Sequence, residues 1–352
     1  MRRFLTLRLF NGFLVLCGVV VIVFFLFHIL PGDPVALMAG QRSDLATREA
    51  ITRELGLDLP LWEQFVLYVN DLSPLSLHSD TEANRNKYGY SSLLVLPSGD
   101  ALVLKAPYMR RSFQTNQRVV QMILSNIGST VWLALAAMLI ASVVGISFGI
   151  LSASRQGSIT DHLILSGSVF GISVPSFVAA LFIALVFGYY LSDFTGLNLS
   201  GQLWVNHPYR GRELHLENLI LPAITLSLRP MAVITQLTRN SMLEVLKQDY
   251  VRTARAKGLS ERRVITEHAF KNALNPIITG VSGWLASLLT GAFFVEYIFD
   301  WKGFGFMTIK AVQSLDFPVV MGSTLFIASL FVLITISVDL LYAAADPRIR
   351  LE

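Results

Sequence analysis

Six long apolar stretches recur along the chain, and the segments between them carry most of the charged side chains. The apolar stretches are residues 9–30, 119–154, 162–192, 218–238, 272–295 and 317–338. A helix needs about 20 apolar residues to cross a bilayer core about 30 Å thick. Because lipid offers the backbone no hydrogen-bond partners, the pattern predicts six transmembrane helices and an all-α polytopic membrane protein.

The composition of the 352-residue chain supports the same fold class. Hydrophobic residues make up 53% and charged residues 15%, whereas soluble domains contain about 25% charged residues. These values exclude an ordinary cytosolic enzyme and a disordered chain. The net charge of +4 is too small to indicate a nucleic-acid partner. Cys17 is the single cysteine in the sequence, so no internal disulfide is expected, and no group of residues suggests a metal or a cofactor.

Basic residues in the short connections predict the orientation of these helices. Lys and Arg gather at residues 2–8, at Arg155, in residues 239–271 and at residues 348–350. Six crossings put all of these regions on one side of the membrane, and the positive-inside rule makes that side the cytoplasm. Both termini are therefore predicted to be cytoplasmic. The long segment of residues 31–118 then faces outward, because long loops translocate largely regardless of charge.

The first apolar stretch is predicted to be a retained helix rather than a signal peptide. Its apolar run is longer than the roughly 7–15 residues of a signal core, and Leu30-Pro31-Gly32-Asp33 is unlike a small-residue cleavage site. The expected organisation is an N-terminus with the first helix in residues 1–30, an extracytoplasmic segment in 31–118, a transmembrane core of five helices in 119–345 and a cytoplasmic tail in 346–352.

The extracytoplasmic segment is predicted to have structure of its own. Residues 44–69 show helical spacing. The short apolar runs 93–96 and 101–104 flank Pro97-Ser98-Gly99-Asp100, whose composition is typical of a turn. A small β-hairpin is therefore expected there.

The cytoplasmic segment of residues 239–275 combines small and basic side chains in a pattern typical of a short exposed helix. Ala254 and Gly258 are four residues apart and stack on one helical face, where small side chains let another surface approach the backbone. Gly258 is expected to end this helix and Ser260 to begin the next one. Composition alone leaves an alternative open, because a basic loop can also serve only to fix the topology.

The sequence YVRTARAKGLS at residues 250–260, followed by His268, Asn272-Ala273 and Pro276, resembles the cytoplasmic loop of ABC importer permeases of the dipeptide/oligopeptide/nickel family. Only Ala254 and Gly258 match the more general importer motif. The segment of residues 73–118 is longer than the corresponding segment usually is in this family. Further segments similar to the family occur along the rest of the chain: LPGDP at 30–34, LGLD at 55–58, GISVPSF at 171–177, LPAITLSL at 221–228, GFG at 303–305 and DPRIR at 346–350.

The resemblance implies a permease subunit of an ATP-driven importer in a bacterial cytoplasmic (inner) membrane, which translocates peptides or similar small solutes. The partners that it implies are a second homologous permease, two ABC ATPase subunits and an extracytoplasmic solute-binding protein. In this family a coupling helix in the loop docks on the ATPase. That role falls here on Arg252, Thr253, Ala254, Arg255, Ala256, Lys257, Gly258 and Leu259.

The chain carries no residues for nucleotide chemistry of its own. It has no Gly-x-x-x-x-Gly-Lys-Ser/Thr loop and no Ser/His/Asp or His-Glu-x-x-His arrangement. We therefore expect a transporter subunit rather than an enzyme, with ATP hydrolysis on partner subunits. The alternative is a stand-alone secondary transporter or channel, which would need intramembrane acids. A membrane receptor or assembly factor that works through the extracytoplasmic segment is a third class.

Three residues inside the predicted spans are candidates for the translocation pathway. Pro175, beside Ser173, is expected to kink the third span, either for packing or beside the pathway. Arg229 falls near the middle of the fourth span, where an unpaired charge is costly. It is predicted either to line the pathway and attract a carboxylate of the solute, or to pair with Asp339 or Glu296.

Overall fold

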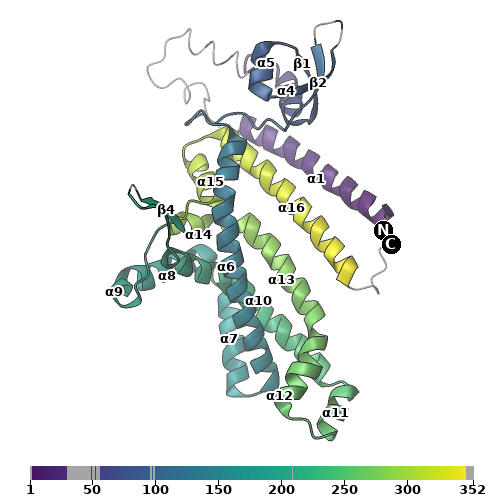
Figure 1. The fold of residues 1–352 in the computed structure, drawn as a ribbon, viewed down its shortest axis with the longest axis vertical. Coiled ribbons are helices and arrows are strands. Elements are labelled where there is room, and N and C mark those ends of the chain that lie inside the picture. The colour runs from purple at the N-terminus through teal and green to yellow at the C-terminus, as the bar shows by residue number, and fades with distance from the viewer. Residues whose placement is uncertain are drawn as a thin grey trace. The chain divides into compact units, whose positions relative to one another are not determined.

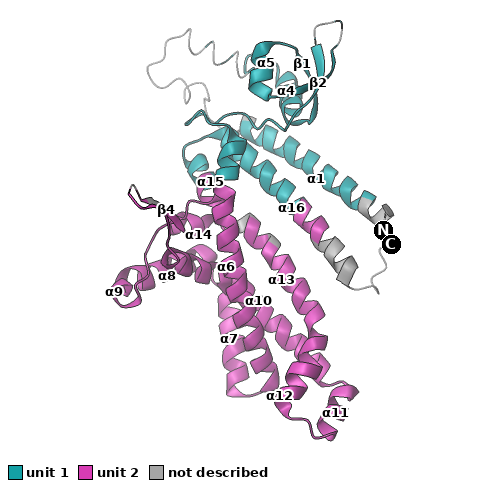
Figure 2. Cartoon of the chain, in the orientation of Figure 1, with its two compact units in different colours: residues 1–125, 308–332 teal, residues 126–307, 333–352 magenta. Residues whose placement is uncertain are grey.

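The computed structural model describes residues 2–29, 56–95, 100–207 and 209–345, together with residues 49, 52 and 97. The chain divides into two compact units (Figure 2). The first consists of residues 1–125 and 308–332, and the second of residues 126–307 and 333–352. Figure 1 labels most of the helices, and strands β1, β2 and β4, that are named below.

Helices dominate the described part of the chain, as the apolar pattern predicts. Four of them are long and apolar enough to cross a membrane, and one pair of helices passes the same test together but is bent by 105° at a break. The four are α1 (Arg2–Ile29), α6 (Val119–Ser154), α10 (Glu217–Leu246) and α16 (Phe317–Ala345). The bent pair consists of α7 (Ile159–Ser173) followed by α8 (Ser176–Ile183) with the π-helix η1 (Ala184–Tyr190).

The predicted fifth span differs from the other five. Its residues form α13 (Lys271–Gly291) and the short α14 (Phe293–Ile298). α13 is long enough to cross a bilayer, but it is not among the helices that pass the hydropathy test in the described residues. Four to five spans are thus supported by length and composition.

In the first unit, a small α/β layer lies between α1 and α6 in the sequence. α4 (Leu61–Leu72) and α5 (Glu82–Tyr88) accompany a three-stranded antiparallel sheet of order β1-β3-β2. The strands are β1 (Leu75–Ser79), β2 (Ser91–Val95) and β3 (Asp100–Leu104). The pairing of β2 with β3 confirms the hairpin predicted around Pro97–Asp100. α4 packs on α1 and α16 through a shared apolar cluster that includes Phe24, Tyr68 and Met321.

One face of this sheet covers a buried group of polar and aromatic side chains. The carboxylate of Asp71 accepts hydrogen bonds from the Tyr88 hydroxyl at 2.9 Å and from Arg110 Nε at 3.4 Å. Lys105 Nζ donates to the Asp71 carbonyl oxygen. The His78 ring stacks on Tyr88 with 4.2 Å between ring centroids. These contacts join α4, α5 and His78 of β1 to the segment that follows β3.

His78 makes the stability of this sheet depend on pH. Its side chain is 9% exposed, and its Nε2 has no hydrogen-bond partner among the described residues. Burial, followed by the positive charge of Lys105, lowers the pKa of His78 below its usual 6.5, against the opposing effect of Asp71. Below about pH 6.5 the unfolded chain takes up a proton that the folded sheet resists. The free energy of unfolding should therefore fall as the pH drops from 7.5 to 5.

Hydrogen exchange of residues 75–104 in the full-length protein, corrected for intrinsic rates, measures this effect. We expect protection to decrease at pH 5 relative to pH 7.5. The His78→Phe variant keeps the ring stacking but cannot be protonated, so its protection should change much less between the two pH values. An equal loss of protection in both proteins would show that another group is responsible.

In the second unit, α10 is the central helix, and it packs on α6, α7, α8 and α13. Gly145 and Gly149, four residues apart on α6, let α10 come close. A Cβ built on Gly149 would lie 2.5 Å from Thr238 Cβ and 2.7 Å from the Thr235 carbonyl oxygen, and one on Gly145 would lie 2.8 Å from the Met231 carbonyl oxygen. This is the close approach that Gly-x-x-x-Gly spacing provides between membrane helices.

Short elements connect the long helices of the second unit. Before α10 come α9 (Ser192–Thr195) and a hairpin of β4 (Trp204–His207) with β5 (Gly211–Leu214). After α10 come α11 (Asp249–Ala256), α12 (Glu261–Arg263) and the π-helix η2 (Val264–Phe270). α15 (Phe304–Gln313) begins in this unit and ends in the first.

Candidate functional site

The third predicted span is broken rather than gently kinked at Pro175. Proline has no N–H and disfavours helical backbone at the preceding residue. Val174 accordingly adopts φ −74° and ψ 125°, which ends α7, and Pro175 becomes the N-cap of α8. The two helices meet at 105°. Ser173 lies at the end of α7, where its hydroxyl donates to the Val169 carbonyl oxygen at 2.8 Å.

A cavity of about 780 Å³ opens between α7, α8, α10 and α13. Most of its wall is apolar, and the polar side chains in it include Arg229, Ser168 and Thr235. Of the three pathway candidates, Arg229 lines the cavity, whereas Ser173 and Pro175 do not. Their neighbours Val174 and Ser176 do line it, so the break in the third span shapes one side of the cavity.

Arg229 is exposed at the cavity wall and makes no ion pair with any side chain that the structure describes. Glu296 is not its partner. The Glu296 side chain is fully buried, and its carboxylate accepts hydrogen bonds from the Thr130 hydroxyl at 2.6 Å and the Phe306 N–H at 3.0 Å. The predicted pair with Asp339 falls outside the described side chains. Glu296 therefore ties α14 to α6 and to the start of α15, as an interhelical hydrogen-bonding group.

The loop that follows α10 forms the two short helices that its sequence predicts. Gly258 follows the end of α11 in the left-handed region at φ +78°, and Ser260 is the N-cap of α12. The two helices are joined by an ion pair between Arg255 Nε and Glu261 Oε1 at 2.7 Å. Gly258 suits this turn because most other residues strain at positive φ.

One prediction about this loop needs correction. Ala254 was expected on an open face with Gly258, but it is 5% exposed and packs with Val251 and Val264 in a small apolar cluster of the loop itself. The helix turns Ala254 inward because its period also places Val251 on that side. The exposed members of the predicted coupling segment are Arg252, Thr253, Arg255, Ala256, Lys257 and Gly258, and Leu259 is half-buried.

The loop is anchored to the membrane helices by a second apolar cluster. Met242 on α10, Ala153 on α6, Ala269 on η2 and Ile277 on α13 are buried together. The loop is therefore packed directly against these three helices.

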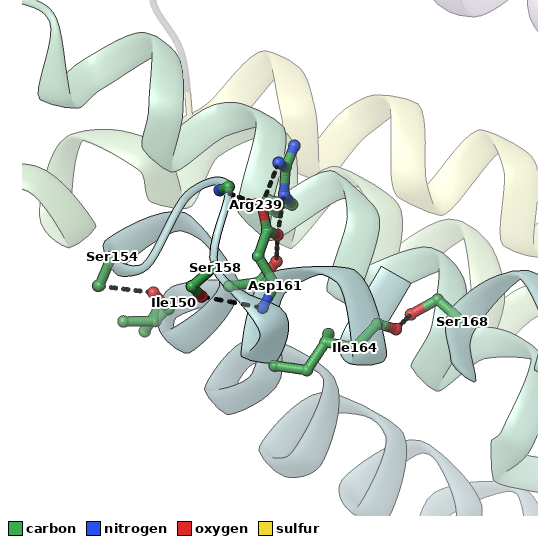
Figure 3. Close-up of polar contacts among 9 residues, drawn as sticks. Ile150, Ser154, Ser158, Asp161, Ile164, Ser168 and Arg239 are labelled. Atoms are coloured by element: carbon green, nitrogen blue, oxygen red, sulfur yellow. Dashed lines mark hydrogen bonds and ion pairs between the residues drawn. The ribbon is translucent and has the colours of Figure 1, made fainter. Parts of the chain in front are cut away.

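A buried ion pair between α7 and α10 was not predicted from the sequence. Arg239 Nε and Nη2 each donate to one oxygen of the Asp161 carboxylate, both at 2.8 Å (Figure 3). The sequence pattern uses Arg239 only as one of the basic residues that predict the orientation of the helices. The signal available in the sequence was Asp161 itself, an acid at the edge of a span in an otherwise basic region. The Gly145-x-x-x-Gly149 spacing was a second readable signal that the sequence analysis missed.

The fold and these sites define a class of protein: a multi-pass helical membrane protein with a cavity among its helices and an anchored helical loop outside them. Residues 145–351 match the family described as "Binding-protein-dependent transport system inner membrane component", and residues 1–92 match its N-terminal counterpart. The chain belongs to this family. It is the membrane permease subunit of an ABC importer rather than an enzyme, and it works with ATPase and binding-protein partners, the ATPase activity lying in partner subunits.

Individual relatives cover nearly the whole chain. The dipeptide transport system permease protein DppB of Escherichia coli (strain K12) is 35% identical over 351 residues, with 95% of this chain and 94% of the relative covered. The di/tripeptide transport system permease protein DppB of Pseudomonas aeruginosa is 36% identical over 350 residues, with the same coverage. A solved inward-facing structure of the MetNI methionine ABC transporter is 14% identical and covers 64% of this chain and 97% of its own, with a TM-score of 0.49.

Proposed function

We propose that this permease translocates short peptides and that Arg229 binds the carboxylate of the peptide in the cavity between α7, α8, α10 and α13. The observation that carries the proposal is an arginine without an ion-pair partner among the described side chains, placed on the wall of a largely apolar cavity. A charge within a span usually faces a water-filled path or a partner. The relatives with dipeptide and di/tripeptide transport in their names support peptides as the solute.

The same wall offers an acceptor for the other end of a peptide. Pro230 lies inside α10 and has no N–H, so the Leu226 carbonyl lacks its usual helical partner. Leu226, Arg229 and Pro230 all line the cavity. A guanidinium and a free carbonyl one turn apart suit a zwitterion, because they bind the carboxylate and an N–H or ammonium group respectively.

The topology in this proposal has six crossings, with α13 as the fifth, both termini in the cytoplasm and residues 31–118 outside. It is supported by the placement of basic residues and by the length of α13. The complex in the proposal contains a second homologous permease and two ATPase subunits in a bacterial inner membrane. The proposal divides the chain into four parts: the N-terminus with the first helix (1–30), the outer segment (31–118), the core of five helices (119–345) and the cytoplasmic tail (346–352).

The ATPase contact in this proposal is the exposed part of α11 and the turn after it. Arg252, Arg255 and Lys257 give it positive charge, and Gly258 leaves open space beside its Cα. The loop rests on η2, which packs with α10 and α13. Closure of the ATPases would therefore move helices that line the cavity.

Co-expression with the candidate partners tests this proposal. We expect the chain to co-purify with ATPase subunits and, in proteoliposomes with the binding protein, to take up a labelled dipeptide only when ATP is present. Uptake by the purified chain alone would contradict the proposal and favour a stand-alone transporter or channel.

The coupling surface has its own prediction. Charge reversal in the double variant Arg252→Glu/Lys257→Glu should reduce co-purification of the ATPase subunits at least tenfold. The reason is that an ATPase surface complementary to the present positive charge would be repelled by the new negative charge. Arg155→Glu is the matched control, since Arg155 is an exposed basic residue of another predicted cytoplasmic loop. The surface is wrongly assigned if both proteins retain the ATPase equally.

A further inference from the structure

The Asp161–Arg239 pair differs from the exposed ion pairs of the cytoplasmic loop. Asp161 is 1% exposed and the Arg239 side chain 16%, whereas the side chains of the Arg263–Glu267 pair are 59% and 48% exposed. Its two parallel N–H···O bonds at 2.8 Å fix both the distance and the rotation of one helix relative to the other.

The Asp161 carboxylate also gathers donors from the neighbouring turn and helix. The Ser152 hydroxyl at the end of α6 donates to Oδ1, and the Gly157 N–H donates to Oδ2 at 2.9 Å. The Ser158 hydroxyl accepts from the Asp161 N–H at 3.3 Å and caps α7 (Figure 3). One carboxylate thus holds the end of α6, the turn, the start of α7 and α10 together. Because a buried ion pair often adds little stability relative to apolar residues, what this arrangement contributes is the placement of these segments relative to one another.

The pair lies between the cavity and the coupling loop. On one side, residues of α7 such as Leu163 and Gly171, and residues of α10 from Thr225 to Thr235, line the cavity. On the other side, α10 runs from Arg239 to Leu246, close to the start of α11 at Asp249. α7 is thereby fastened to α10 at the end that adjoins the loop, while its other end is the break at Pro175.

We propose that Asp161 and Arg239 are a positioning pair that makes α7 move with α10, so that movement of the coupling loop reaches both walls of the cavity. The proposal rests on the coupling surface and cavity of the proposed function. Without the pair, α10 would still follow the loop, but α7 and the break at Pro175 would not follow α10.

Coupling between ATP hydrolysis and uptake is the quantity that tests the pair. In proteoliposomes with the complete transporter and binding protein, hydrolysis and dipeptide uptake are measured in the same vesicles. For Asp161→Asn and for Arg239→Gln we expect hydrolysis within about twofold of wild type and at least a tenfold fall in peptide taken up per ATP. Arg263→Gln, which removes the same charge from an exposed pair, should keep the wild-type ratio.

A double variant separates positioning from stability. Asp161→Leu/Arg239→Met replaces the pair by apolar side chains, a change that often preserves folding. We expect the double variant to assemble with the ATPases and to take up as little peptide per ATP as the single variants. A restored ratio in this variant, or parallel losses of hydrolysis and uptake in the single variants, would overturn the proposal. If wild type shows no ATP-driven peptide uptake, the proposed function fails instead.

Discussion

Replacement of Gly149 by leucine is expected to prevent the folded permease from accumulating in the membrane. The first added carbon would lie 2.5 Å from Thr238 Cβ and 2.7 Å from a backbone oxygen of α10, so the helices themselves would have to separate. Overpacking a close interface typically costs about 1–3 kcal/mol, and a leucine at a helix–helix crossing is at the severe end. Detergent-solubilised yield and thermal unfolding of the purified protein measure the effect.

Gly128→Leu is the matched control for Gly149→Leu. Gly128 lies on the same helix, and a Cβ there has nothing within 4 Å. This variant should reach wild-type yield and unfold within a few degrees of wild type. If Gly149→Leu behaves like Gly128→Leu, α6 and α10 do not pack as closely at Gly149 as described here.

Replacement of Arg229 by glutamine is expected to raise the KM for uptake of a dipeptide at least tenfold. The loss of a charge-assisted hydrogen bond to a carboxylate is worth about 1.5–3 kcal/mol, and each 1.4 kcal/mol corresponds to about a factor of ten. Initial uptake rates in proteoliposomes, measured over a range of peptide concentrations at saturating ATP, separate KM from the maximal rate. Arg229→Lys should show a smaller change, because the charge remains.

The peptide itself provides the control for Arg229. A dipeptide whose C-terminus is an amide lacks the carboxylate, so any uptake of it should be equal in wild type and Arg229→Gln. A wild-type KM for the free dipeptide in Arg229→Gln would remove Arg229 from the pathway. An equal rise in KM for both peptides would mean that Arg229 shapes the cavity without binding the carboxylate.

The apolar periodicity predicts the long helices because burial in lipid depends on composition over about 20 residues. Local chemistry also suffices for the hairpin at Pro97–Asp100 and for the turn at Gly258, since each depends on residues within a few positions. The inward turn of Ala254 was missed because Val264, which covers it, belongs to a different helix. A kink at Pro175 was predicted, but the full break and its angle of 105° depend on the packing of α8 against α10 and α14.

Pairs that are distant in sequence cannot be predicted from the local pattern of residues. Asp161 and Arg239 are 78 residues apart, and Thr130 and Glu296 are 166 apart. The sequence shows that each of these polar groups is costly near lipid and therefore needs a partner. It does not show which partner, because that choice is made by helix packing. Of the three pathway candidates that the sequence suggested, Arg229, Ser173 and Pro175, only Arg229 lines the cavity, because the sequence does not show which faces of the helices meet around it.

The π-helical geometry of η2 constrains how this loop can change in length. A π-turn holds more residues than an α-turn, and successive residues of an α-helix are rotated by about 100°. Deleting one residue from Val264–Phe270 would let the backbone relax into an ordinary α-helix. The preceding helices α11 and α12 would then be rotated about the axis of η2. Arg252 and Lys257 would then point away from their present direction while keeping their chemistry. Natural variation in this stretch should accordingly consist of substitutions, with insertions and deletions confined to loops that transmit no motion.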